Sequence, residues 1–469
     1  MAPQQRRGGA RLTCGTLAAL AAALGACNAA WAVKTNVATP VMVALGLDLG
    51  GVGYARLAGP LTGAFVQPLA GSLMDARPSR RRPLLLCGAA ALAGGMVLLA
   101  RSRTQGAAVA ALWVLDAGMN VVMAGSRCIV AALGARAQAR GNAALAASVG
   151  AGQLLGFGVA AVPIWLEWLT FGVAVAVIGG ALVTAMAAAG LETQAEAATQ
   201  PREEREPLPP AGAMRRSLEH FAVPPWMRAL VAAIFLSWLG WYSHILFTTQ
   251  WIAADVFGGD ARAAGGTPEG DAYARGVRWA SGALAVFAGA AASGAAAVPA
   301  LARAVGEPRA LTISYAVLAT LLACTSAVPR GGRWAASAIV ACMGLPWAIT
   351  QSLPYAVVAA HAPVARRGAL LGTLNVFITL PEVTVDLGVK PLLRAIQGDG
   401  AAAGSGAGTV LLLGALPAAL ASVAALFVPS VAAARLHTAG SDDGDDMEMA
   451  HNRDRADEPT EDALLLGRG

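Results

Sequence analysis

Long apolar runs separated by short polar turns make up nearly the whole chain. Twelve of these runs are long enough to cross a bilayer as helices, since about 20 apolar residues span its hydrocarbon core. Their approximate bounds are 14–46, 52–74, 84–100, 106–134, 142–162, 166–190, 226–251, 277–302, 310–328, 334–360, 368–393 and 403–429. The first run exceeds what one span needs, and Pro40 is expected to bend or end it near the far surface. The pattern predicts an all-α membrane protein with twelve transmembrane helices.

One polar stretch, 192–225, divides the twelve runs into two sets of six. It contains PREEREPLPP and cannot bury a core, so we expect a cytoplasmic linker between two six-helix halves, 14–191 and 226–430. Residues 1–13 are the predicted cytoplasmic N-terminus, and residues 431–469 are an acidic tail expected to be disordered in the cytoplasm. Transporters with this 6+6 plan bind substrate near the midplane, between their halves.

Composition supports a multi-pass membrane protein that contacts lipid over most of its length. Hydrophobic residues make up 56% of the chain and charged residues 13%, about half of what soluble domains carry. The net charge of +6 comes largely from arginines in short loops, which favours the positive-inside rule over nucleic-acid binding. The sequence has no Walker motif, no HExxH motif and no nucleophile–base arrangement, so we predict no enzyme, cofactor, metal site or ATP-driven pump.

A short basic turn joins the second and third runs. The segment LAGPLTGAFVQPLAGSLMDARPSRRRP contains the pattern G-x-x-x-D-x-R, in which Asp75 is the acidic residue, followed by Arg80, Arg81 and Arg82. Two spans joined by so basic a turn leave it on the cytoplasmic side. The turn resembles the loop between helices 2 and 3 of major facilitator transporters. That resemblance implies the major facilitator fold and gating roles for Asp75, Arg80 and Arg81.

Further motifs narrow the resemblance to plant sucrose–proton symporters and animal solute carrier family 45. The segment WVLDAGMNVVMAGSR resembles the family pattern W-I-L-D…N…R and places Asp116, Asn120 and Arg127 at the matching positions. GNAALAASVGAGQLLGFGVA resembles the fifth helix through Asn142, and LGTLNVFITLPEVTVDLGVKPL resembles helix 11 through Asn375. The resemblance implies secondary active symport of protons with sucrose or a related disaccharide or glycoside, by alternating access.

The chain departs from this family in helices 1 and 7. Lys34 stands where the family has glutamine or glutamate, and Thr248, Thr249 and Gln250 stand where plant symporters carry acidic residues. The basic loop is also shortened. A second hypothesis is therefore a transport-inactive relative that acts as a sensor or regulates organelle pH. Detectable counterflow of sugar would separate a carrier from a sensor.

Lys34 and Asp116 are charges at membrane depth. Such a charge costs about 2.5–3.5 kcal/mol on the insertion scale unless it is paired or hydrated. Asp116 lies near the midplane, ten residues into the fourth run. We hypothesise that the two residues approach each other, with Asp116 as the protonatable carboxylate and Lys34 stabilising its charged form until proton and sugar bind. The alternative is a static pair that joins two helices.

Several other polar residues are candidates for contact with substrate. Arg127 lies three helical turns beyond Asp116 and either contributes to binding or coupling or extends to the inner interface. Asn120, Gln351 and Asn375 are expected hydroxyl partners in a central cavity, and the family match adds Asn142.

A stripe of charge on the eleventh run predicts an outer gate. Glu382, Asp386 and Lys390 recur at every fourth residue, and Arg56 lies near the outer end of the second run. These two spans face each other in major facilitator folds. We predict a gate ion pair between Arg56 and Asp386 or Glu382, formed in the inward-open state. The alternative is an Asp386–Lys390 pair within the helix.

The acidic tail carries one short sorting pattern. Glu461 followed by Leu465 and Leu466 has the acidic dileucine spacing that clathrin adaptors bind, although such short patterns also arise by chance. We therefore expect either the plasma membrane or a vacuolar or endolysosomal membrane. The predicted partners are a small-molecule sugar, protons, the lipid bilayer and an adaptor, and no nucleic acid.

Overall fold

The computed structural model describes residues 13–133, 135–196, 223–362, 367–397 and 406–431. Within these ranges the chain is helical, with no strand. Outside the described residues lie 197–222 of the predicted linker, 1–12 of the N-terminal segment and 432–469 of the acidic tail, with Glu461, Leu465 and Leu466. Residues 192–196 of the predicted linker are described and helical.

The N-terminal half contains the helices that precede the linker. Its elements are α1 (Cys14–Ala44), α2 (Leu49–Arg56), α3 (Ala58–Ala76), the 3-10 turn η1 (Pro78–Arg80), α4 (Arg81–Arg101), α5 (Gln105–Ala131), α6 (Ala135–Ala161) and α7 (Leu166–Glu196).

The C-terminal half contains the helices that follow the linker. Its elements are η2 (Pro225–Met227), α9 (Arg228–Gln250), the π-helical turn η3 (Trp251–Val256), α10 (Pro268–Val305), α11 (Glu307–Cys324), η4 (Thr325–Ala327), α12 (Arg333–Cys342), α13 (Gly344–Thr350), α14 (Leu353–His361), α15 (Arg367–Gln397) and α16 (Ala407–Ala425).

The predicted fold class is confirmed, and each of the twelve apolar runs coincides with a helix or an interrupted helix. In the described part, ten segments are long and apolar enough to cross a membrane. The two remaining runs are α2–α3, which is interrupted at Leu57, and α15, which carries charged residues. Pro40 does not end α1, because that helix continues to Ala44.

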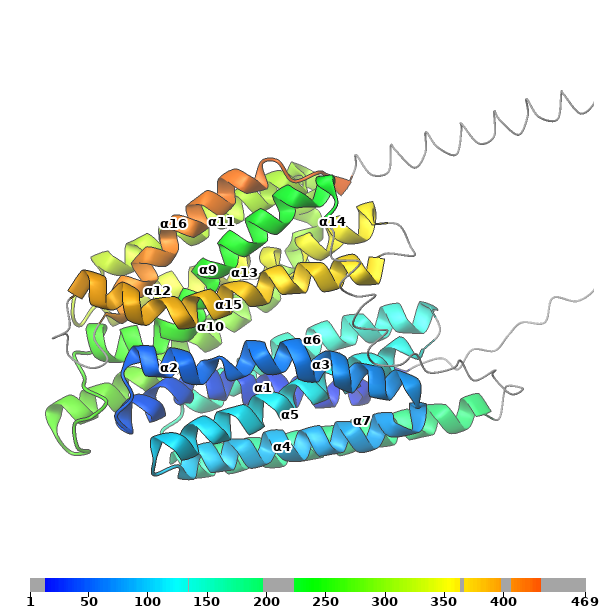
Figure 1. Ribbon diagram of the computed structural model, residues 1–469, viewed down its shortest axis with the longest axis horizontal. Helices are drawn as coiled ribbons and strands as arrows, with labels where there is room; N and C mark the ends of the chain where they lie inside the picture. Colours follow the sequence, from blue (N-terminus) through cyan, green and yellow to red (C-terminus); the bar gives the residue numbers. More distant parts are fainter. Residues whose placement is uncertain (1–12, 134, 197–222, 363–366, 398–405, 432–469) are drawn as a thin grey trace, which may run out of the picture.

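The two halves form two layers of roughly parallel helices. Figure 1 shows α1–α7, coloured blue to teal, along one side and α9–α16, coloured green to orange, along the other. Contacts between the layers are made chiefly by α6 with α10 and by α2 with α15. The boundary between the layers is therefore formed mainly by these two pairs of helices.

Small residues allow the helices within each half to approach closely. Lipid tails are as apolar as side chains, so membrane helices associate through tight packing rather than burial from water. Gly95 of α4 lies against α5, where a Cβ atom would come within 2.7 Å of the Leu115 backbone nitrogen. The neighbouring Gly94 has no atom within 4 Å of such a position. Gly95 therefore forms part of the α4–α5 contact, whereas Gly94 does not.

We predict that Gly95→Ala destabilises the protein, because the added methyl group forces α4 and α5 apart at a cost of about 1–3 kcal/mol. Gly94→Ala is the matched control and is expected to be neutral or slightly stabilising, because alanine has the better helix propensity. Thermal unfolding of the two purified variants in the same detergent checks this. Equal melting temperatures would contradict the predicted packing.

Candidate functional site

Lys34 of α1 and Asp116 of α5 meet inside the N-terminal half. The Lys34 Nζ atom lies 2.7 Å from Asp116 Oδ1, and both side chains are buried. This ion pair joins α1 to α5. The expected approach of the two residues is observed, while their role in coupling stays a prediction.

Asp116 is held by a polar network that joins α5 to α3. One turn further along α5, the Asn120 side chain donates a 2.9 Å hydrogen bond to the Asp116 carbonyl oxygen. It also donates a 3.0 Å bond to the Thr62 hydroxyl of α3. Asp116 Oδ2 lies beside Gly59 of α3, 3.8 Å from where a Cβ atom would be. Lys34 thus contacts one carboxylate oxygen, while the other faces the glycine.

Glu382 of α15 brings a second carboxylate to this glycine from the opposite half. Its Oε1 atom lies 3.2 Å from the position of a Cβ atom on Gly59. Lys34 and Arg56 are close enough to attract Glu382 electrostatically, and Asp116 is close enough to repel it. The Tyr242 hydroxyl of α9 lies close enough to Glu382 to interact with it electrostatically. The site therefore crosses the boundary between the halves.

Asp386, one turn beyond Glu382 on α15, is completely buried. Neither of its carboxylate oxygens has a hydrogen-bond partner among the described residues. Gly53 of α2 lies against the Asp386 carbonyl oxygen, with no room for a side chain at that glycine. This contact brings the backbones of α2 and α15 together.

The predicted gate ion pair is absent from this conformation. Arg56 lies within electrostatic range of Asp386 and Glu382 but within 4 Å of neither carboxylate. Its Nη1 atom instead donates a 3.3 Å hydrogen bond to the Thr39 hydroxyl of α1. Arg56 ends α2, just before the interruption at Leu57, and its guanidinium is directed to α1. The alternative pair within α15 lies outside the described residues, because the Lys390 side chain does.

Hydrogen bonds between the halves close the outer side. Asn36 of α1 bonds the Ser281 hydroxyl of α10, and its side-chain oxygen accepts a 2.8 Å bond from Thr249 of α9. Arg262, in the loop before α10, donates a 3.3 Å bond to the Gly46 carbonyl oxygen. Thr249, one of the departures from the family pattern, thus contributes to this closed seam.

Four predicted substrate-contacting residues are exposed on the inner side: Arg127, Asn142, Gln351 and Asn375. The Tyr355 hydroxyl donates a 3.2 Å hydrogen bond to the Asn375 side-chain oxygen and is within electrostatic range of Arg127. With the cytoplasmic termini that the loop charges predict, an outer side closed by contacts and an inner side with exposed polar groups correspond to an inward-facing conformation.

The predicted inner-gate residues are placed only in part. Arg80 is exposed at the end of η1, and the half-buried Arg81 begins α4. The Asp75 side chain lies outside what the structure describes. The gating role of these residues stays a prediction.

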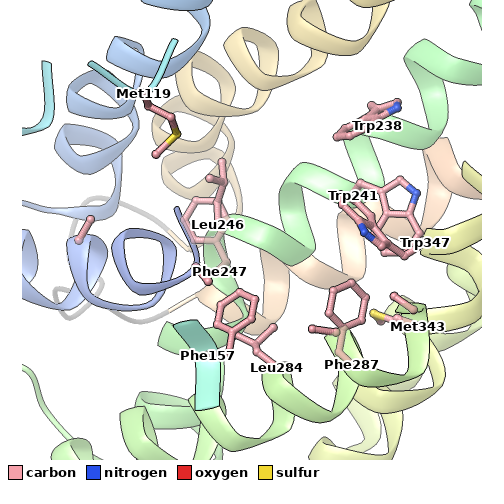
Figure 2. Packing of buried hydrophobic residues seen from close by; sticks show 14 of the residues in the cluster. Met119, Phe157, Trp238, Trp241, Leu246, Phe247, Leu284, Phe287, Met343 and Trp347 are labelled. Atoms are coloured by element: carbon pink, nitrogen blue, oxygen red, sulfur yellow. The ribbon is translucent and has the colours of Figure 1, made fainter. Parts of the chain in front are cut away.

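Aromatic side chains form a cluster in the C-terminal half. Trp241, Trp347 and Phe287 pack edge-on or tilted, with 5.0 Å between the ring centres of the two tryptophans (Figure 2). Trp238 lies 5.6 Å from Trp347 and 5.2 Å from Tyr242, so the cluster extends to the tyrosine beside Glu382. These rings form an apolar wall next to the charged site.

Several site residues were not singled out from the sequence, among them Asn36, Thr39, Thr62 and Tyr242. Each places a polar group within an otherwise apolar run, and polar groups within spans usually face the protein interior. That signal alone would have marked them as candidates. Their partners could not be deduced, because the bonds join residues on different helices.

Comparison with known proteins identifies a family of membrane transporters and two similar plant proteins. Residues 14–383 match the family model of the Major Facilitator Superfamily. Sucrose transport protein SUT2 of Oryza sativa subsp. indica is 27% identical over 453 residues, which cover 83% of this chain and 89% of SUT2. Sucrose transport protein SUC4 of Arabidopsis thaliana is 27% identical over 458 residues, covering 82% and 87%.

The crystal structure of the nucleoside transporter NupG is similar in fold. It superposes with a TM-score of 0.61 at 12% identity and covers 88% of this chain and 98% of NupG. At this identity the likeness concerns the fold alone.

We predict that Lys34→Met destabilises the protein by about 3–5 kcal/mol, because it leaves the buried Asp116 charge unpaired. Adding Asp116→Leu removes that charge and is expected to restore most of the lost stability. Thermal unfolding of both variants and of Asp116→Leu alone completes a double-mutant cycle. Additive losses in the double variant would show that the two side chains do not interact.

Proposed function

Because the chain belongs to the Major Facilitator Superfamily, we propose that it is a secondary transporter that moves sucrose or a related disaccharide or glycoside together with protons. The observation that carries the proposal is the buried Lys34–Asp116 pair, which faces Glu382 across the boundary between the halves. The plant sucrose transport proteins among the relatives support a sugar as the substrate.

The polar groups around Gly59 suit a ligand rich in hydroxyls. Asp116 Oδ2 and Glu382 Oε1 both lie beside this glycine, and a carboxylate accepts hydrogen bonds from two adjacent hydroxyls. Asn120 supplies an amide next to Asp116. The Tyr242 and Trp238 rings provide an apolar face on the opposite side of the boundary, which fits the C–H surface of a pyranose ring. Binding between these groups engages both halves at once.

Protonation of Asp116 is the proposed coupling step. In the inward-facing conformation Lys34 pairs with Asp116, which corresponds to a carboxylate that has released its proton. A proton on Asp116 removes the charge that holds Lys34. Glu382, on the other half, is then a second carboxylate close enough to attract the ammonium group. Exchange of Lys34 between a partner in its own half and one across the boundary would link proton binding to movement of the halves.

Charge balance in the cluster supports a role for protons. Lys34 and Arg56 are two cations, whereas Asp116, Glu382 and Asp386 are three carboxylates. Asp386 is completely buried, and neither of its oxygens has a hydrogen-bond partner in the part of the chain that the structure describes, an arrangement that is costly for an ionised group. We infer that Asp386 carries a proton in this conformation, which leaves the remaining four charges balanced.

Sucrose uptake by yeast that lacks its own sucrose transport and extracellular invertase tests the function. The chain would carry Leu465→Ala and Leu466→Ala, to favour delivery to the cell surface if the proposed adaptor motif acts. We expect uptake to be faster at pH 5 than at pH 7 and to be abolished by a protonophore, because the proton gradient drives accumulation. Glu269→Gln, which changes an exposed residue at the start of α10, serves as a control and should transport like the parent.

A rate of sucrose uptake that is unchanged by the protonophore would contradict proton coupling. No uptake and no counterflow, with surface expression verified, would contradict sucrose transport and favour another substrate or a sensor that does not transport.

A further inference from the structure

A pocket separate from the charged site lies at the predicted outer end of the molecule. It has a volume of about 530 Å³ and is formed by the end of α6, the first half of α10 and the start of α12. Its lining includes three arginines, Arg275, Arg278 and Arg333, and no acidic residue. The transport mechanism proposed above uses none of these side chains.

No carboxylate of the described residues pairs with these three arginines. None of them belongs to an ion pair of 4 Å or less within the described residues. Arg275 and Arg278 are three residues apart on α10, so both project from the same face of that helix. Three neighbouring guanidinium groups repel one another, and each presents several hydrogen-bond donors. A bound anion with several acceptor oxygens would offset the repulsion and use those donors.

Two tryptophans hold Arg333 in place. Its guanidinium carbon lies 4.9 Å from the ring centre of Trp279 and 5.9 Å from that of Trp334. The Trp279 indole nitrogen donates a 2.8 Å hydrogen bond to the Ser337 hydroxyl and a 3.2 Å bond to the Arg333 carbonyl oxygen. The aromatic groups and the arginine therefore form one ordered cluster.

The part of the pocket further along α10 is apolar and reaches the exposed surface of that helix. Ala161, Gly282, Ala283 and Val286 line it, and Val286 is 58% exposed. Tryptophans mark the level of lipid headgroups in membrane proteins, and arginines there bind phosphates. A ligand with a phosphate at one end and a hydrocarbon chain at the other matches a pocket in which arginines are followed by apolar residues. A free phosphate would use the arginines but not the apolar surface.

We propose that this pocket binds the phosphate headgroup of an anionic phospholipid, with an acyl chain along α10. Ala161 comes from the N-terminal half and the other lining residues from the C-terminal half. The Ala161 Cβ atom lies only 4.0 Å from where a Cβ atom on Gly282 would be, so the pocket is complete when the outer side is closed. Such a lipid would favour the inward-facing conformation, because the pocket loses one wall when the outer side opens.

Native mass spectrometry of the purified full-length chain tests the proposal. The protein would be mixed with dimyristoyl-phosphatidylglycerol or dimyristoyl-phosphatidylcholine at equal concentrations. We expect the anionic lipid to be retained several-fold better than the zwitterionic one. Arg275→Gln with Arg333→Gln should abolish this preference. The matched control is Arg101→Gln with Arg103→Gln, which removes two exposed arginines of the other half and should keep the preference.

A second variant tests the apolar part and retains all three arginines. Val286→Trp fills the surface where the acyl chain is expected and should lower retention of the anionic lipid. Equal retention by the parent and the Arg275/Arg333 variant would overturn the proposal. If sn-glycerol 3-phosphate displaced the lipid at comparable concentrations, or Val286→Trp had no effect, the pocket would bind a soluble anion rather than a lipid.

Discussion

The cost of a charge in the membrane interior constrains this structure more than any other interaction. Lys34 and Asp116 are both buried, and each charge stabilises the other because the Lys34 Nζ and Asp116 Oδ1 atoms lie 2.7 Å apart. Removing either would leave an unpaired charge in a region of low dielectric. The pair occupies a helix surface that faces the other half rather than the centre of its own half, since Asp116 Oδ2 and Glu382 Oε1 lie beside the same glycine. Any change in the charge of Asp116 therefore acts on the boundary between the halves.

The bonds across the outer side are suited to opening and closing. The seam consists of neutral side-chain hydrogen bonds around Asn36 and one bond from Arg262 to a carbonyl oxygen. Each such bond contributes about 0.5–1.5 kcal/mol to stability, so a few of them can be broken at modest cost. A close backbone contact between Gly53 and Asp386 joins short α2 to α15, and no ion pair of 4 Å or less joins these two helices among the described residues. An inward-facing conformation held in this way can yield to the binding energy of a substrate.

Much of this architecture follows from the sequence, because lipid restricts what a spanning segment can be. The length and hydrophobicity of the apolar runs were sufficient to predict the twelve spans. The free-energy cost of a buried charge was sufficient to predict that Lys34 lies near Asp116. The predicted gate pair is not formed in this conformation, in which the Arg56 guanidinium donates a hydrogen bond to the Thr39 hydroxyl instead. The direction of such a long side chain cannot be deduced from its position in the sequence. The partners of Asn36 and Tyr242 could not be predicted either, because they lie on helices that only the tertiary packing brings together.

Sucrose-driven proton movement in proteoliposomes tests the central claim that Asp116 couples protons to sugar. A pH-sensitive dye inside the vesicles would report proton entry when sucrose is added outside without a pH gradient. Lumenal acidification with the parent chain, together with sucrose exchange but no acidification with Asp116→Asn, is the predicted result. Acidification by Asp116→Asn equal to that of the parent would contradict the claim and assign proton coupling to another group.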